Sequence, residues 1–158
     1  CNIESYVACG GMPKKKATED FYFLQSLAKY TTIKKVRNCI VFPSSRYEQR
    51  VYLGTGFRIK EYKNFGGFKN LSFSDQSFNV LKDTINIITK SYKMHWDEFD
   101  KNILTNLNDK VSRFLKSKKI KTVWPQINTN AKTQSQFNLF FHQWFDALMV
   151  IQFLKKLN

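Results

Sequence analysis

The main prediction about fold and function is based on the segment Gly10–Leu24, which has the sequence GGMPKKKATEDFYFL. A Gly-Gly turn leads through a basic loop to an acidic pair, Glu19 and Asp20, and then to an apolar run. Thr18 can cap a helix, and the helix dipole favours acidic side chains in a first turn. We therefore predict a helix that starts at the acidic pair, with both carboxylates in its first turn, and continues through residues 21–30.

A second segment, Pro43–Gly56 with the sequence PSSRYEQRVYLGTG, carries two arginines four residues apart. A guanidinium group binds two phosphate oxygens at once, so Arg46 and Arg50 are candidate phosphate ligands. The glycines of Gly54-Thr55-Gly56 allow backbone amides to approach an anion closely. The alternative for the arginines is a solvated loop, and the sequence leaves both interpretations open.

The remainder of residues 1–73 is predicted to hold two short strands and a long loop. Apolar runs at Ile33–Val36 and Asn38–Phe42 indicate strands, the second one buried and ending before Pro43. The loop over residues 43–73 contains serine and glycine pairs that break every periodicity. A loop of this length inside a compact chain is usually functional or disordered.

Residues 74–158 are predicted to be helical. Ser74 can cap a first helix, apolar residues from Trp96 to Phe114 continue a second, and Pro125 separates these from a last helix. The aromatic side chains recur at helical spacing, so we assign them to a hydrophobic core rather than to a base-stacking surface. The predicted fold class is therefore α/β, followed by a helical C-terminal region.

The composition excludes several classes of protein. Of the 158 residues 42% are hydrophobic, which is too many for a disordered tail. The apolar stretch Leu139–Leu154 is shorter and more polar than a membrane span, which needs about 20 apolar residues. Cys1, Cys9 and Cys39 form a sparse, odd set that indicates reduced thiols inside a cell. Neither they nor the two histidines have metal-ligand spacing, so no metal site is predicted in this chain.

The formal net charge of +14 implies an anionic partner: nucleic acid, an acidic membrane surface, or the phosphates of a small ligand. The cations form short clusters such as Lys116–Lys121, which are typical of solvated faces. No nucleic-acid-binding motif is present, which makes nucleic acid the weaker assignment. A non-catalytic basic module that packs on a partner protein or a membrane surface is the alternative to an enzyme.

The Gly-Gly turn, the basic spacer, the Glu19-Asp20 pair and the apolar helix resemble the acceptor-side half of family 2 glycosyltransferases of the GT-A type. The loop over residues 43–56 and the sequence FHQWFD at residues 141–146 are similar to a bacterial subgroup of that family. The resemblance covers most of the chain. It implies a partial GT-A-like α/β fold in residues 1–73, the acceptor-side part of a catalytic domain, and a helical region in residues 74–158.

The resemblance also implies a reaction, the inverting transfer of a sugar from a nucleotide-sugar donor to a hydroxyl of a glycan or lipid-linked acceptor. Asp20 matches the general base and Glu19 the supporting carboxylate. A carboxylate within ~3 Å of the hydroxyl can take its proton as the new bond forms. Arg46, Arg50 and the backbone of Gly54-Thr55-Gly56 are the candidates for holding the departing diphosphate. The competing interpretation is that both acids only favour the first helical turn.

The chain departs from this family in its donor half. Family members hold a divalent cation, Mg²⁺ or Mn²⁺, with an Asp-x-Asp motif, and no such motif precedes Asp20. The nearest approach, Asp97–Asp100, lacks the single-residue gap. We therefore expect a fragment of a longer enzyme, inactive by itself, whose missing N-terminal half binds the donor and the metal. The expected location is cytoplasmic, with peripheral contact at the inner face of the membrane left open.

Overall fold

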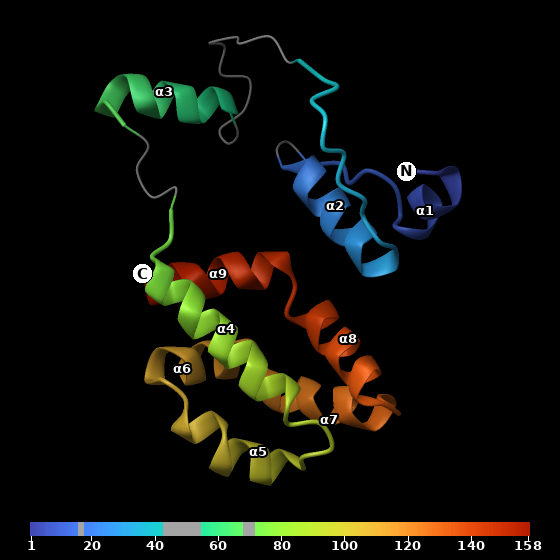
Figure 1. The fold of residues 1–158 in the computed structure, drawn as a ribbon, viewed down its shortest axis with the longest axis vertical. Helices are drawn as coiled ribbons and strands as arrows, with labels where there is room; N and C mark the ends of the chain where they lie inside the picture. The colour runs from blue at the N-terminus through green and yellow to red at the C-terminus, as the bar shows by residue number, and fades with distance from the viewer. Residues whose placement is uncertain (16–17, 43–54, 68–71) are drawn as a thin grey trace. The chain divides into compact units, whose positions relative to one another are not determined.

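The computed structural model describes residues 1–15, 18–42, 55–67 and 72–158. It divides into two compact units, Cys1–Leu71 and Ser72–Asn158, called unit 1 and unit 2 below. The regular structure of the described residues is helical, and none of them lies in a β-strand (Figure 1). The predicted α/β class is therefore wrong. The described part of the chain is all-helical and is not a partial GT-A-like fold.

The two predicted strands of unit 1 are the direct cause of this error. Residues 33–36 and 38–42 are described, and they form an exposed chain without regular structure. A strand persists only where a neighbour satisfies its backbone groups and covers an apolar face. The run Ile40–Phe42 has the composition of a buried strand, but the described residues supply no sheet for it to join.

The described residues of unit 1 form the helices α1 (Ile3–Ala8), α2 (Glu19–Tyr30) and α3 (Thr55–Phe65). The helix predicted after the acidic pair is confirmed as α2, which contacts α1. Thr18 precedes α2 with a left-handed φ of 61°, and its side chain makes no capping hydrogen bond to the helix. Leu27 is the buried residue of α2.

Helix α3 corrects the prediction that residues 43–73 are irregular throughout. Arg58 and Glu61 lie one turn apart on it and form an ion pair with 2.7 Å between Nη1 and Oε2. The helix ends at Gly66, which has a φ of 67° and donates its amide to the carbonyl of Tyr62 at 2.8 Å. The ion pair and the terminal glycine mark this helix, whereas its apolar residues show no helical periodicity that would have predicted it.

Unit 2 contains more helices than the sequence predicts, because two predicted long helices are broken. The helices are α4 (Asp75–Thr89), α5 (Trp96–Asn102), the 3-10 turn η1 (Leu104–Asn106), α6 (Asp109–Ser117), α7 (Ile120–Asn130), α8 (Gln134–Trp144) and α9 (Ala147–Leu157). The predicted cap at Ser74 is confirmed, since its side chain accepts a hydrogen bond from the amide of Ser77.

Each break coincides with a side chain that caps the helix after it. Asn108 accepts a hydrogen bond from the amide of Lys110 at 2.9 Å and starts α6. Asp146 accepts one from the amide of Met149 at 3.2 Å and starts α9. The prediction of one helix from Trp96 to Phe114 is therefore wrong. The apolar spacing continues across the capped break, so it does not reveal that the helix is interrupted.

Pro125 was expected to separate two helices and instead lies inside α7. Proline removes the amide that would bond the carbonyl four residues earlier, here that of Lys121. Both residues are exposed, so water can satisfy this carbonyl and the helix continues.

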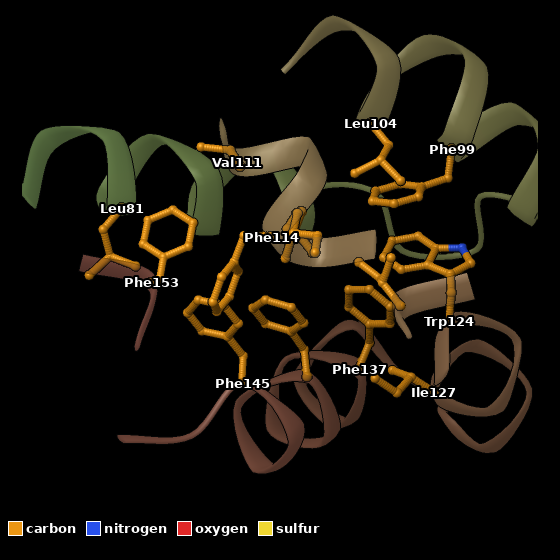
Figure 2. Packing of buried hydrophobic residues seen from close by; sticks show 14 of the residues in the cluster. Leu81, Phe99, Leu104, Val111, Phe114, Trp124, Ile127, Phe137, Phe145 and Phe153 are labelled. Carbon is orange, nitrogen blue, oxygen red and sulfur yellow. The ribbon is translucent and has the colours of Figure 1, made fainter. Parts of the chain in front are cut away.

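Aromatic rings form the centre of unit 2 (Figure 2). The ring of Phe99 stacks on Trp124 with 3.7 Å between centroids, and Phe137 meets Trp124 edge-on at 5.6 Å. The indole of Trp124 donates to the carbonyl of Met94 at 3.0 Å, so its polar atom is satisfied. The prediction that the aromatics at helical spacing form a core is confirmed for Phe99 and Phe137, which are buried, and Trp124, which no predicted stripe included, is buried with them.

The C-terminus of unit 2 packs against the start of α4. Asn158 Oδ1 accepts a hydrogen bond from the hydroxyl of Ser77 at 2.8 Å, and Ser77 is itself buried. Helices α4 and α9 are thereby joined at their ends as well as by their apolar faces. Of the helices that the structure describes, none has the length and apolar character needed to cross a membrane.

Candidate functional site

The Gly-Gly turn of the predicted site ends helix α1. Gly10 has a φ of 77° and donates to the carbonyl of Val7, while Gly11 has a φ of 72° and donates to that of Tyr6, both at 2.9 Å. This pair of hydrogen bonds is a Schellman motif, in which left-handed residues satisfy the last carbonyls of a helix. Glycine is favoured at both positions because it has no Cβ to clash.

Tyr6 fixes the chain that follows this turn. Its hydroxyl oxygen accepts a hydrogen bond from the amide of Met12 at 3.1 Å, and its ring lies 5.7 Å from that of Phe23 on α2. A Cβ on Gly11 would lie 3.2 Å from the Tyr6 ring, so the close approach also requires glycine there. The turn thus places the basic loop beside the start of α2.

Asp20 and Glu19 are both exposed in the first turn of α2. Asp20 Oδ1 accepts a hydrogen bond from the amide of Phe21 at 2.8 Å. Its other oxygen, Oδ2, has no hydrogen-bond partner among the residues the structure describes. The carboxylate of this exposed residue therefore has one oxygen fixed by the backbone and one without a hydrogen-bond partner among the described residues.

Lys15 brings a positive charge to the same helical turn. Its Nζ lies 3.2 Å from the centroid of the Tyr22 ring, a cation–π contact. Tyr22 stands three residues after Glu19, on the same side of α2 by helical spacing. Lys15 belongs to the basic loop of the predicted segment, and its contact with a ring of the helix that follows was not predicted.

The structure does not show the other predicted site residues near Asp20. Arg46, Arg50 and Gly54 lie outside the described residues. Thr55 and Gly56 begin α3, so the expected Gly-Thr-Gly loop is in part the first turn of a helix. Their proximity to the Asp20 carboxylate stays a prediction.

No group of three or more His, Cys, Asp or Glu side chains that could hold a metal ion occurs within the described residues. The acidic run Asp97–Asp100 lies on α5, and Asp100 Oδ1 is 3.9 Å from the Nζ of Lys116. The described residues therefore do not fit a divalent-cation site.

A shallow open pocket lies in unit 2 where the N-termini of α4 and α6 approach the chain end. Sequence analysis missed it, apart from the cap at Ser74. Its polar atoms serve the packing of these helices: Ser77 bonds Asn158, and Lys110 Nζ donates to the carbonyl of Leu157 at 3.3 Å. The pocket contains no carboxylate or histidine side chain that could act as a base.

Several of the unit 2 cations that follow α5 have partners within the unit. Arg113 pairs with Asp109 one turn away, and Lys118 Nζ donates to Gln152 Oε1 at 2.5 Å. The large aromatic rings next to them in sequence are buried and cannot stack on bases.

Comparison with known proteins adds no relative: no family model, no curated protein and no solved structure matches the chain.

Proposed function

We propose that the chain contributes the acceptor-side residues of an inverting glycosyltransferase, with Asp20 as the general base. The acceptor hydroxyl attacks the anomeric carbon of a nucleotide sugar, the bond to the diphosphate breaks, and the hydroxyl proton passes to Asp20. Glu19 supports the negative field at this position. The proposal rests on the motif resemblance and on the state of the Asp20 carboxylate.

The single observation that supports it best is the pair of unlike oxygens on Asp20. A general base must be accessible to its substrate and held in one orientation. Oδ1 is held by the Phe21 amide, and the Asp20 side chain is exposed, with no described hydrogen-bond partner at Oδ2.

The departing nucleoside diphosphate requires positive charge, which this proposal assigns to Arg46 and Arg50. Backbone amides at Thr55 and Gly56, at the start of α3, add donors, and the proposal assigns the same role to Gly54, which lies outside the described residues. Glycosyltransfer of this type uses a divalent cation on the diphosphate. Because the described residues do not fit such a site, we assign its ligands to a donor-binding half outside this chain. We place the reaction in the cytoplasm, in keeping with the sparse, odd set of cysteines.

The test is the variant Asp20→Asn, made in the enzyme that joins this chain to its donor-binding half. Release of nucleoside diphosphate from UDP-glucose, UDP-N-acetylglucosamine and GDP-mannose would be measured with Mg²⁺ or Mn²⁺. We expect kcat to fall by about 10²–10⁴-fold with little change in KM, because a general base contributes on that scale.

Asp75→Asn is the matched control. Asp75 is likewise an exposed acid in the first turn of a helix, α4, and it lies in unit 2. Both variants should retain the helical circular dichroism of the parent, and Asp75→Asn should retain its activity. Full activity of Asp20→Asn would exclude the proposed role, and equal losses in the two variants would assign Asp20 to helix stability.

A further inference from the structure

The segment Ile33–Phe42 exposes large apolar side chains that the rest of the described chain does not cover. Phe42 is 83% exposed, Ile40 71% and Val41 69%. These three residues are consecutive in the sequence and together form one exposed apolar group, which is called the apolar tip below. Single exposed apolar residues are ordinary on protein surfaces, whereas a contiguous group indicates an interaction site.

The same segment is strongly basic. Lys34, Lys35 and Arg37 lie within it, every residue from 31 to 42 is exposed, and no acidic residue occurs in that range. The segment has no regular structure, so its backbone forms no helix or sheet hydrogen bonds. The apolar tip therefore lies beside three cations that have no acidic neighbour within residues 31–42. A partner that binds both features must itself be apolar and anionic.

We propose that Ile33–Phe42 is a docking segment for an anionic lipid bilayer. The cations would bind lipid headgroups while Ile40, Val41 and Phe42 enter the boundary with the acyl chains. Stable peripheral binding needs two such signals, because either one alone is weak. The backbone of the segment stays at headgroup depth, since unpaired peptide groups are costly in hydrocarbon.

Charge decides between a bilayer and a second copy of the chain. Pairing two such segments would bring six cations together without an acid between them, and like charges at close range are unfavourable. An anionic bilayer instead offers a large number of negative charges over an apolar layer. This inference does not rest on the proposed function, since it involves neither Asp20 nor the arginines of residues 43–56.

The experiment is co-sedimentation of the full chain with vesicles of phosphatidylcholine alone and of phosphatidylcholine mixed with phosphatidylglycerol. We expect binding to the mixed vesicles that weakens as salt is raised, and little binding to the neutral ones. The triple variant Lys34→Gln, Lys35→Gln, Arg37→Gln should bind about a hundredfold more weakly, because each cation contributes about one tenfold step or slightly less. The variant Ile40→Ser, Val41→Ser, Phe42→Ser should bind at least tenfold more weakly.

The matched control for charge is Lys119→Gln, Lys121→Gln, Lys132→Gln, which removes three exposed cations from unit 2. Leu139→Ser is the control for exposed apolar surface. Both should bind mixed vesicles as the parent does. The proposal would be overturned if the control variants lost as much affinity for mixed vesicles as the segment variants. It would also be overturned if the chain bound neutral vesicles as well as mixed ones, or bound neither. Dimerisation in sedimentation velocity that the Ile40–Phe42 variant abolishes would overturn it as well and would assign the tip to a protein contact.

Discussion

Units 1 and 2 have similar hydrophobic compositions and reach very different degrees of burial. Within the described residues, unit 1 buries one large apolar side chain, Leu27, whereas unit 2 buries sixteen hydrophobic residues. Among the same described residues, unit 1 exposes twelve large hydrophobic side chains and unit 2 exposes three. Helices form in both units, so the difference lies in how many neighbouring elements each helix has to pack against.

This comparison separates local from tertiary stability. A 12-residue helix such as α2 is marginal in water by itself, because nucleation is costly and few hydrogen bonds repay it. In unit 2 each helix packs an apolar stripe on others, and burial supplies the missing free energy. We therefore expect unit 2 to unfold cooperatively and unit 1 to contribute little to that transition.

The sharpest test compares one residue type in the two units. Phe137→Ala removes a fully buried ring that contacts Trp124, so we expect a loss of about 3–5 kcal/mol in the free energy of unfolding. Phe42→Ala removes an exposed ring and should change it by less than about 0.5 kcal/mol. Urea unfolding followed by circular dichroism measures both. Similar losses would mean that unit 1 shares the core of unit 2.

The next effect concerns the turn in unit 1. Alanine at Gly10 or Gly11 must adopt a left-handed backbone, which costs about 1–2 kcal/mol. Gly11→Ala also forces a Cβ against the ring of Tyr6, so we expect the larger effect there, while Gly10 has open space. Hydrogen-exchange protection of the Met12 amide reports on this turn. Equal effects of the two substitutions would show that the contact with Tyr6 does not constrain it.

A smaller effect is expected at the cap of α4. Ser74→Ala removes the acceptor of the Ser77 amide and a hydroxyl beside Asn158, so unit 2 should lose about 1 kcal/mol. Ser72→Ala, two residues earlier and outside the helix, is the control and should have no measurable effect. The two variants would be compared by their urea midpoints. No difference between them would leave α4 stabilised by packing alone.

The smallest effect is expected at the ion pair between Arg113 and Asp109 on α6. Both side chains are about three-quarters exposed, so solvent screens the attraction. Arg113→Gln should cost about 0.3–0.5 kcal/mol at low salt and nothing measurable at high salt. Thermal unfolding at two salt concentrations measures this. A loss that persists at high salt would indicate packing by the arginine stem.

The predictions from sequence succeeded where the cause is local. The cap at Ser74 is set by a side chain at the helix end, and α2 begins at the predicted acidic pair, although the predicted cap at Thr18 is wrong because its side chain makes no capping hydrogen bond. The aromatic spacing of unit 2 also predicted correctly that Phe99 and Phe137 belong to a core. For the candidate site, the sequence predicted an acidic helix N-terminus at Asp20, and the structure added the contacts of Tyr6 and Lys15 that position the loop beside it.

The predictions failed where the answer depends on distant residues. The run Ile40–Phe42 favours a strand, but a strand needs a sheet, and the described chain supplies none. The apolar spacing from Trp96 to Phe114 runs across a capped break, since packing on neighbouring helices preserves the apolar positions while Asn108 redirects the backbone. Spacing alone cannot distinguish one long helix from several that share a core.

The amino-acid sequence by itself determined the cap at Ser74, the glycine turn after α1 and the acidic first turn of α2, because capping and backbone sterics act within a few residues. Only the tertiary structure decided which apolar residues are buried. Burial depends on whether another element arrives to cover a surface, and in this chain that happened for the helices of unit 2 and not for the segment Ile33–Phe42.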